Sequence, residues 1–519
     1  MRSLVALVAV ALLAGLSLSG AQGIGGETTQ LVSVSSDGSA GFGFSGSPSI
    51  SADGRYVAFA SEANNFVPND TNAQDVFLHD RQTGVTELIS VATDGTQADR
   101  PASNPSVSGD GRYVVFASEA DELVPNDGNG ESDVFLRDTV AGTTTRVSVA
   151  SDGTEGDLES LTPSISANGR FVTFTSRANT LAPDDDEQDL DVFIHDLETG
   201  VTELVSQSTE GAHGNFSSGG IAAGPARVSA DGRYVAFGSF ADNLVPSDGN
   251  QADDAFIRDR QLGTTERVSV SSFGTQGESH SMHPAVSDDG RFVVFDSLSQ
   301  TLVADDDNLA TDVFLHDRQT GETTIVSRPP AGLANEASYF PAISGDGRWI
   351  SFASEASNLV ASDENERTDV FLFDTQTGAL ERVSVSDLGV EGDSDSTFSS
   401  LSADGATIAY QSAAMTLAPD DSNPATDVFV RGKPLREPTA TPTPTRTPTP
   451  QPPELPGDTD CNGSINSIDA ALVLQLSAGF IGALPCPDAG DVNGNGRTDS
   501  VDAALILQFV AGLLDSLPA

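Results

Sequence analysis

The stretch Ser51-Ala-Asp-Gly-Arg-Tyr-Val-Ala-Phe59 joins a tight-turn signal, Asp53-Gly54, to an alternating apolar strand. Variants of this phrase begin at six further serines: Ser108, Ser166, Ser229, Ser287, Ser344 and Ser402. Successive copies are 57 or 58 residues apart, except for one step of 63 residues. A fixed period with repeated strand signals indicates a β architecture built from repeats.

Each repeat contains four predicted strands, which the first copy places at residues 48–51, 55–61, 75–80 and 85–91. A loop rich in Asp and Asn, residues 64–74 in this copy, separates the second strand from the third. Four consecutive antiparallel strands in each of seven copies predict a mainly β fold, a seven-bladed β-propeller.

The two ends of the repeat region complement each other. The last copy ends after Asp427–Val430 without a fourth strand, and Thr28–Ser35 precedes the first copy as a spare fourth strand. We therefore expect the N-terminal strand to complete the last blade and to close the ring over residues 28–433, which removes exposed sheet edges.

The phrase Pro48-Ser-Ile-Ser51, followed by Asp53-Gly-Arg-Tyr-Val-Ala-Phe59, resembles the repeats of TolB-type (WD40-like) β-propellers over all seven copies. The resemblance implies the fold and leaves the function open, because propellers serve in binding, scaffolding and catalysis. The arginine of the phrase occurs in six copies and is Ala406 in the seventh. We expect this arginine to make a hydrogen bond between blades.

The remaining segments predict export and a second module. Residues 1–21 have a positive start, an apolar run and a small-residue cleavage site, which indicates a signal peptide and a secreted, extracellular protein. The apolar run is too short for a good membrane span, so no transmembrane anchor is expected. Residues 434–456 form a Pro/Thr-rich linker, and residues 457–519 form a short C-terminal module.

The charge of the chain restricts its partners. It contains 25 Lys and Arg against 76 Asp and Glu, a formal net charge of −51. Nucleic acid and anionic membranes repel such a chain, whereas its carboxylates suit Ca²⁺.

The C-terminal module contains two loops with oxygen-bearing residues at calcium-loop spacing, and each loop runs into an apolar helix. The predicted metal positions are Asp458, Asp460, Asn462, Ser464, Asn466 and Asp469 in the first loop, and Asp491, Asn493, Asn495, Arg497, Asp499 and Asp502 in the second. The seventh position, Ser464 or Arg497, would offer its backbone carbonyl. The twelfth position is Asp where an EF-hand has Glu.

These tandem half-hands, an all-α double calcium-loop module, resemble a type I dockerin. The resemblance implies Ca²⁺ as cofactor, a cohesin-like protein module as partner, and two binding orientations from two near-identical halves. The recognition positions Ser467-Ile468 and Ser500-Val501 differ from the familiar cellulosomal pattern, which leaves a different cohesin or an intramolecular partner open. The two cysteines, Cys461 and Cys486, are able to pair in an oxidising compartment, and the sequence leaves this open.

The Asp-rich loops of the blades have two readings. The pattern Asp127-x-Asn129-x-x-x-Asp133 recurs with small changes in other blades. Such residues cap turns by bonding their own backbone, and they also form calcium clips. Because the pattern repeats, we expect a structural role in either case.

A ligand site is expected where the repeats differ. Blades 5 to 7 carry an aromatic and imidazole patch on the face with the long loops: His280, Met282, His283, Tyr339, Phe340 and Phe398. Such a patch suits a polysaccharide or peptide ligand, and ordinary loop variation is the alternative. The long link Gly211–Arg227 lies beside it and accounts for the 63-residue step.

The sequence thus favours a secreted calcium-binding protein whose propeller is a binding or scaffold domain and whose dockerin-like module docks to a partner. The alternative is a polysaccharide-degrading propeller enzyme, a glycoside hydrolase or lyase carried by a dockerin. A purely structural surface-layer protein is a third possibility. The sequence contains no nucleophile elbow, zinc helix or phosphate loop, so catalytic residues stay unassigned.

Overall fold

The computed structural model describes residues 27–68, 70, 73–183, 189–421, 423–432, 455–460 and 464–518. The chain divides into two compact units, Met1–Leu435 and Arg436–Ala519. The expected signal peptide lies outside the described residues, as does most of the expected linker. Among the helices that the structure describes, none has the length and apolar character to span a membrane.

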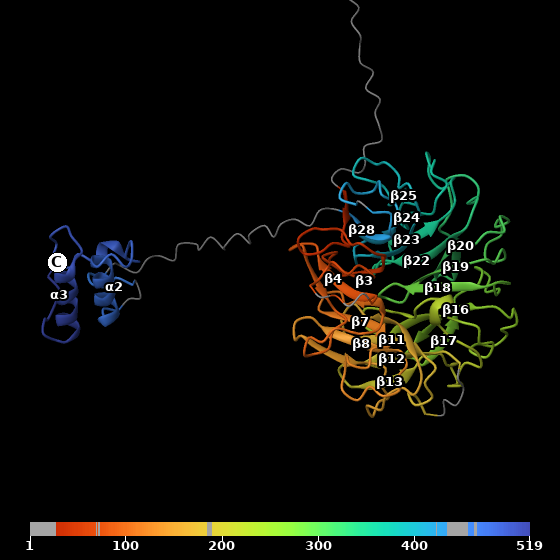
Figure 1. Cartoon of the computed structure of the whole chain (residues 1–519), viewed down its shortest axis with the longest axis horizontal. Coiled ribbons are helices and arrows are strands. Elements are labelled where there is room, and N and C mark those ends of the chain that lie inside the picture. The colour runs from red at the N-terminus through yellow and green to blue at the C-terminus, as the bar shows by residue number, and fades with distance from the viewer. Residues whose placement is uncertain are drawn as a thin grey trace, which may run out of the picture. The chain divides into compact units, whose positions relative to one another are not determined.

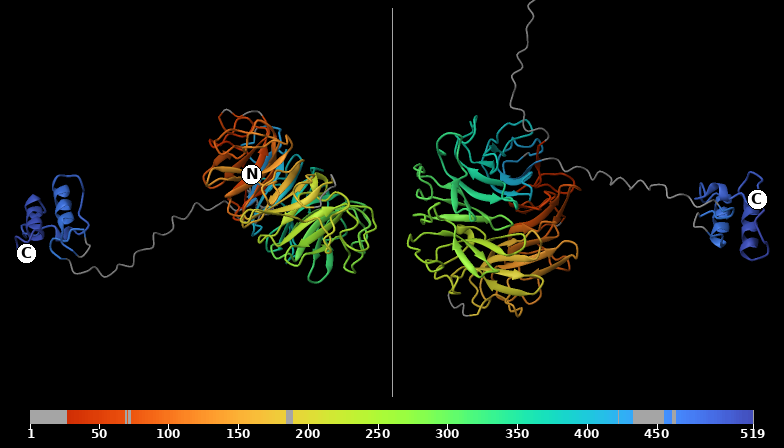
Figure 2. Two further views of the ribbon diagram at one scale, coloured as in Figure 1. Left: turned by 90° about the horizontal axis from the view of Figure 1, so that it is seen from below. Right: turned by 180° about the vertical axis from the view of Figure 1, so that it is seen from behind.

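Seven four-stranded antiparallel sheets surround a common axis in the first unit (Figures 1 and 2). The first three blades are β2 (Ser45–Ile50), β3 (Tyr56–Ser61), β4 (Asp75–Asp80) and β5 (Val85–Leu88); β6 (Ala102–Val107), β7 (Tyr113–Ser118), β8 (Asp133–Asp138) and β9 (Thr143–Arg146); and β10 (Ser160–Ile165), β11 (Phe171–Ser176), β12 (Asp191–Asp196) and β13 (Val201–Leu204). Blades 4 and 5 are β14 (Arg227–Val228), β15 (Tyr234–Ser239), β16 (Asp254–Asp259) and β17 (Thr264–Arg267); and β18 (Ser281–Val286), β19 (Phe292–Ser297), β20 (Asp312–Asp317) and β21 (Glu322–Ile325). Blade 6 is β22 (Ser338–Ile343), β23 (Trp349–Ser354), β24 (Asp369–Asp374) and β25 (Leu380–Arg382).

Blade 7 combines both ends of the repeat region. Its strands are β26 (Ser396–Leu401), β27 (Thr407–Ser412), β28 (Asp427–Gly432) and β1 (Thr28–Leu31). β1 pairs antiparallel with β28. The predicted seven-bladed propeller, closed by its N-terminal strand, is confirmed.

Every blade carries an aromatic pair on one face, where the pair packs against the preceding blade. The second strand places an aromatic ring against a phenylalanine of the third strand, with ring centroids 5.8–6.0 Å apart. In blade 1 the pair is Phe59 and Phe77, and both side chains are fully buried. Because successive residues of a strand point to opposite faces, the neighbouring apolar residues pack against the adjacent blades.

The Asp-Gly turns between the first and second strands depend on local geometry. In blade 1 the backbone N–H of Arg55 donates to Asp53, and Gly54 has φ 72°. The side chain of Arg55 pairs with Asp80 of its own blade, 2.6 Å away, and lies over the ring of Tyr56. The expectation of a hydrogen bond between blades was therefore wrong for this arginine, since the partner ends the third strand of the same sheet.

Blade 4 departs from the other blades at its innermost strand. β14 has only two residues, and the long link before it contains a one-turn helix, α1 (Gly220–Ala223). Gly224, which ends this helix, packs against His283 of blade 5, because a Cβ on Gly224 would lie 2.8 Å from Cδ2 of His283.

The second unit packs two helices over a small core. These helices are α2 (Ser467–Ser477) and α3 (Ser500–Val510), and a 3-10 turn, η1 (Pro487–Ala489), lies between them in the sequence. The buried core residues are Ala470, Val473, Leu484, Val492, Ala503 and Ile506. Asn466 and Asp499 cap the two helices through reciprocal capping boxes.

Candidate functional site

A ring of strained residues surrounds the propeller axis. In six blades the innermost strand has a register shift, and one non-glycine residue there adopts a positive φ between 47° and 56°. The six residues are Ser47, Asn104, Thr162, His283, Phe340 and Phe398. Left-handed backbone is costly for threonine and phenylalanine, and such strain is concentrated at binding sites.

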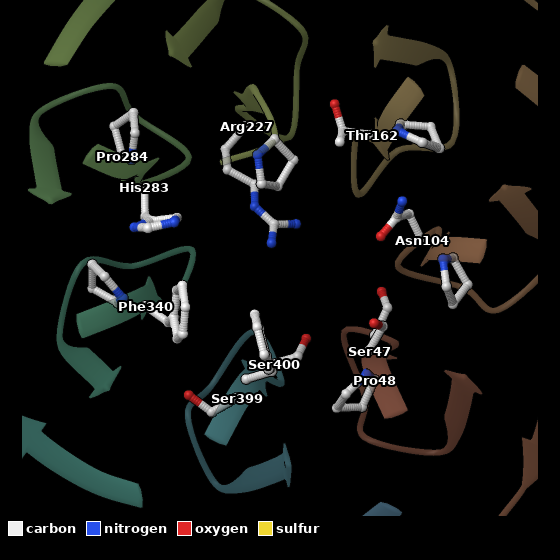
Figure 3. Close-up of a pocket in the computed structure, with 16 residues that line it drawn as sticks. Ser47, Pro48, Asn104, Thr162, Arg227, His283, Pro284, Phe340, Ser399 and Ser400 are labelled. Atoms are coloured by element: carbon white, nitrogen blue, oxygen red, sulfur yellow. The ribbon is translucent and has the colours of Figure 1, made fainter. Parts of the chain in front are cut away.

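The ring encloses a cavity of about 160 Å³ on the propeller axis (Figure 3). The six ring residues line it, together with the residue that follows each of them, which is proline in blades 1, 2, 3, 5 and 6. The residues that differ between the innermost strands of the blades therefore lie around one small space.

Three residues of the predicted patch lie on this cavity. The ring of Phe340 stacks on Phe398 at 4.3 Å and meets His283 edge-to-face at 4.6 Å. Tyr339 packs against Phe340 at 4.9 Å, and its hydroxyl donates to Glu355. The side chains come from three neighbouring blades, so the patch forms only when these blades pack together.

The other three patch residues, Tyr339, His280 and Met282, do not line the cavity. His280 is bonded to Asp253, with 2.8 Å between Nδ1 and Oδ2. Met282 precedes the ring residue in β18 and is half-buried. None of the three contributes to the enclosed space.

Asp296 holds the imidazole and the ring backbone in place. Its side chain is only 1% exposed, and its Oδ2 lies 2.8 Å from Nδ1 of His283. The same oxygen accepts a hydrogen bond from the backbone N–H of Phe340 at 3.0 Å. Because Nδ1 is engaged, Nε2 is the ring nitrogen of His283 that remains for a ligand.

Arg227 enters the cavity from blade 4 (Figure 3). Its register position is occupied by a small residue in the six other blades: Ser49, Ser106, Ser164, Ala285, Ala342 and Ser400. Arg227 also lines a second cavity further along the axis, so it lies between the two spaces. The side chain of Arg227 is exposed to the open space along the axis, and the protein that surrounds this space lowers the pKa of the guanidinium by desolvation. No carboxylate of the described residues lies within 4.0 Å of it.

Sequence reasoning missed Arg227 and Asp296. Each of them is an exception at its repeat position, where the other blades carry small or neutral residues. A comparison of the seven copies position by position would have revealed both residues. His283, Phe340 and Phe398 were predictable because they differ between the copies at the links into the innermost strands.

Three other histidines have a structural place. Nδ1 of His79, His195 and His316 lies 2.8–2.9 Å from a threonine hydroxyl of the adjacent strand. All three are buried, and desolvation lowers their pKa values, to about 4 for His79. They do not form a catalytic set.

The first predicted calcium loop brings three carboxylates together. Ligand oxygens of Asp458, Asp460 and Asp469 lie within 4.8 Å of one another. Asp469 is fully buried and accepts hydrogen bonds from the backbone N–H groups of Thr459 and Asn466. This set of hard oxygen donors fits Ca²⁺. Asn462 lies outside the described residues.

The second loop has related hydrogen bonds, but its carboxylates, all of them among the described residues, do not form such a close group of three in the structure. Asp491 accepts from the backbone N–H of Gly496 at 2.7 Å, and the fully buried Asp502 accepts from the side-chain amide of Asn493 at 2.7 Å. Asn495 accepts from the backbone N–H of Arg497 at 2.9 Å. The backbone N–H groups of the loop are thus directed at acidic oxygens that would also face the ion.

Cys486, at the start of η1, is disulfide-bonded in the structure. The other cysteine of the sequence, Cys461, lies outside the described residues. The sequence left the pairing of these two residues open, and the described residues do not test it.

Comparison with known proteins agrees with this architecture. The family described as Dockerin type I domain matches residues 456–511, so the chain carries a type I dockerin domain. Such a domain supports docking to a cohesin partner. No curated protein matches the sequence.

Solved structures share the propeller fold. TolB from Acinetobacter baumannii is 14% identical, with 63% of each chain covered and a TM-score of 0.36; the chain thus spans less than two thirds of that protein. The β-propeller domain of the Trilobed protease from Pyrococcus furiosus is 12% identical, with 76% of this chain and 98% of that chain covered, at a TM-score of 0.46. An oligogalacturonate lyase from Vibrio parahaemolyticus is 12% identical, with 78% and 93% covered, at 0.44.

Proposed function

We propose that this protein is a secreted binding protein that docks to a cohesin-type partner and holds a carboxylate-bearing ligand in the axial cavity of its propeller. The observation that carries the second part is the guanidinium of Arg227, which lines the axial cavity of a chain of net charge −51 and has no carboxylate partner among the described residues. A guanidinium at such a position gains most from an anion that offers two oxygens in one plane.

The rest of the cavity favours an acidic sugar as the ligand. Phe340 and Phe398 present apolar ring surface, and Asn104 and Ser47 add polar groups on the opposite side (Figure 3). A uronate residue combines an apolar ring face, hydroxyls and a carboxylate. The cavity of about 160 Å³ suits one such unit at the end of a chain.

Exchange of Arg227 for serine, the residue that blade 1 has at this position, tests the proposal with little risk to the fold. We expect the wild type to bind a uronate-containing oligosaccharide more tightly than its methyl-esterified form. Arg227→Ser should lower the affinity for the acidic form by about 10-fold to 100-fold, since a hydrogen bond to a charged group contributes about 1.5–3 kcal/mol. Equal affinity of the wild type for both forms would refute the proposal.

A second candidate function, catalysis on polysaccharide, is favoured by one observation. The buried Asp296 orients His283 at 2.8 Å, which is the arrangement that a general base requires. New reducing or unsaturated ends from the acidic oligosaccharide would establish an enzyme. Their absence together with binding would leave the binding function.

The dockerin domain offers two equivalent apolar faces for its partner. Ile468 on α2 and Val501 on α3 are at matching loop-to-helix positions and are 57% and 55% exposed. Leu474 and Leu507 are a second matched pair, six residues further along each helix, and are 44% and 42% exposed. If either face can dock, Ile468→Asp or Val501→Asp alone should preserve cohesin binding, and the double variant should abolish it. Loss of binding in one single variant would limit docking to that face.

A further inference from the structure

A pair of neighbouring aspartates recurs in the blades, with one member in the Asp-rich loop and the other at the start of the third strand. Described pairs are Asp70 and Asp75, Asp127 and Asp133, Asp248 and Asp254, Asp306 and Asp312, Asp363 and Asp369, and Asp421 and Asp427. The third-strand members are at most 1% exposed. Two buried carboxylates close together repel each other, so each pair requires a cation or a shared proton.

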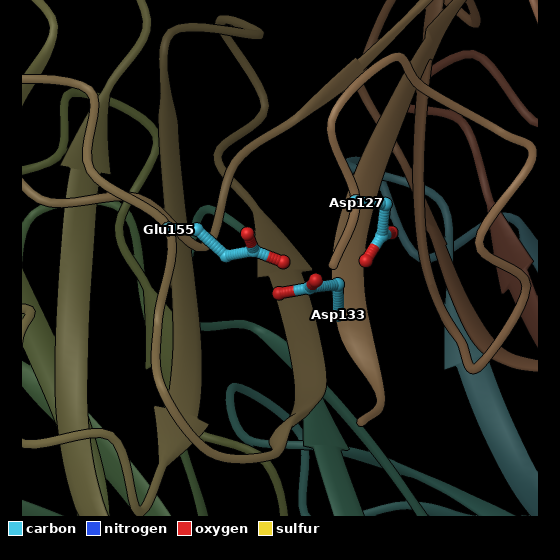
Figure 4. Close-up of side chains that lie close together, drawn as sticks. All are labelled: Asp127, Asp133 and Glu155. Carbon is cyan, nitrogen blue, oxygen red and sulfur yellow. The ribbon is translucent and has the colours of Figure 1, made fainter. Parts of the chain in front are cut away.

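Blade 2 supplies an arginine as the cation. Asp127, Asp133 and Glu155 converge from separate segments, with ligand oxygens within 4.8 Å of one another (Figure 4). Nη1 of Arg146 lies among them, 3.3 Å from Asp127, 3.1 Å from Asp133 and 2.7 Å from Glu155. This acidic cluster therefore already contains its positive charge.

Blades 4 and 6 repeat the arrangement. Nη1 of Arg267 lies 3.3 Å from Asp248 and 3.5 Å from Asp254. Nη1 of Arg382 lies 3.4 Å from Asp363 and 3.1 Å from Asp369. All three arginines come from the fourth strand, opposite the central phenylalanine of the third strand.

In blades 5 and 7 an aliphatic residue occupies the arginine position. Ile325 pairs with Phe314 in blade 5, and Leu31 pairs with Phe429 in blade 7, in the same register as the arginines. The nearby Arg328 of blade 5 pairs instead with the exposed Asp305. The aspartate pairs of these two blades therefore lack the guanidinium that bridges the pairs of blades 2, 4 and 6.

Each of these two pairs also has a buried oxygen without a hydrogen-bond partner among the described residues. The atoms are Oδ1 of Asp306 and Oδ2 of Asp421, in side chains that are 6% and 7% exposed as residues. The second aspartates are satisfied, because Asp312 accepts from Ser327 and Asn308, and Asp427 accepts from Ser33 and Asn423. A buried carboxylate oxygen without a donor requires a water, a shared proton or a cation beside it.

We propose that the aspartate pairs of blades 5 and 7 bind divalent cations, Ca²⁺ above all, where blades 2, 4 and 6 place an arginine nitrogen. Two carboxylates completed by water form a weak site, with a Kd of about 10⁻⁴ to 10⁻³ M, as extracellular calcium modules have. In blade 7 the cation also strengthens the ring closure, because Asp427 on β28 accepts from Ser33, just after β1, at 2.6 Å.

Variants that introduce the arginine of blades 2, 4 and 6 into blades 5 and 7 test this proposal through the number of calcium ions bound per chain. In equilibrium dialysis of the full chain with millimolar Ca²⁺, Ile325→Arg and Leu31→Arg should each reduce the bound calcium by one ion per chain. The reverse exchange in blade 2, Arg146→Leu, should add one ion. The dockerin loops are unchanged in all three variants, so their calcium is a constant background. Unchanged stoichiometry in both arginine variants, with the fold intact, would overturn the proposal.

A second measurement keeps the test valid if a buried arginine prevents folding. Trp349, the one tryptophan of the sequence, lies in β23, so its fluorescence reports thermal unfolding of the propeller alone. Ca²⁺ should raise this unfolding midpoint, and Asp306→Asn and Asp421→Asn should each remove part of the rise. If Ca²⁺ does not change the midpoint of the wild type, the pairs share a proton instead and the proposal is wrong.

Discussion

Removal of calcium should unfold the dockerin domain and leave the propeller folded. The buried apolar core of the domain comprises six side chains, two of them alanine. Modules of this size rarely gain more than about 3–5 kcal/mol from such a core. Each calcium site adds about 4 kcal/mol at a thousandfold excess of ion over its Kd, or about 8 kcal/mol for both. The ions therefore contribute more to the stability of this domain than its core.

Far-ultraviolet circular dichroism of the full chain with a calcium chelator measures this directly. α2 and α3 have 11 residues each, whereas the one described helix of the propeller has 4. The signal at 222 nm therefore reports mainly the dockerin domain, while the fluorescence of Trp349 reports the propeller. We expect the helical signal to collapse and to return with Ca²⁺.

Substitutions test whether the recovery with Ca²⁺ depends on the loop carboxylates themselves or on the acidic charge of the domain in general. Asp458→Ala together with Asp491→Ala should abolish the recovery with Ca²⁺, and Asp515→Ala, an exposed carboxylate outside both loops, should leave it unchanged. A helical signal that survives complete removal of calcium would refute the reasoning, because the small core would then suffice.

Three further predictions concern stability. Leu31→Ala should destabilise the propeller by about 2–5 kcal/mol and speed amide hydrogen exchange in β28. Leu204→Ala, at an equally buried position in blade 3, should destabilise it by a similar amount while the amides of β28 stay protected. Slow exchange in β28 in both variants would argue against closure of the ring by β1. Burial lowers the pKa of His79 to about 4, so the unfolded chain binds the proton first as the pH falls below 6.5. The free energy of unfolding, measured by urea titration, should therefore drop by about 3 kcal/mol between pH 6.5 and pH 4. His79→Arg, which places the residue of blade 2 at this position, should make this pH dependence less steep. Cys486→Ser should destabilise the dockerin domain by about 2–4 kcal/mol and so lower the midpoint of its unfolding transition at 222 nm, while the midpoint of the Trp349 fluorescence transition stays unchanged. Equal 222 nm midpoints in the variant and the wild type would show that the disulfide does not stabilise the dockerin domain.

The fold was predictable because its signals are local and repeated. An Asp-Gly turn such as Asp53-Gly54 and a strand such as Tyr56–Ser61 are encoded within a few residues, and seven copies give the number of blades. The closure by β1 followed from the missing fourth strand of the last copy. The dockerin loops were equally local, because their ligands recur at fixed spacing.

The axial cavity was only partly predictable, because no local pattern encodes it. His283, Phe340 and Phe398 are separated by more than fifty residues each, and they contact one another only because adjacent blades place them at one axis. Arg227 is inconspicuous in the sequence, where it ends a glycine-rich link. Its significance arises from six small residues at the same register in the other blades.

The insertion in blade 4 and the cavity are one feature of the molecule. Within the link that lengthens this repeat, α1 ends at Gly224, and the absence of a side chain there lets the link pack directly against His283. Three residues later the same segment presents Arg227 to the axis. Gly224→Ala would place a Cβ within 2.8 Å of the His283 ring and strain a φ of 83°. It should therefore weaken binding of the acidic ligand without removing any group that touches it, whereas Gly249→Ala, with open space around its Cβ, should have no effect. Unchanged affinity in Gly224→Ala would mean that His283 and Arg227 act independently.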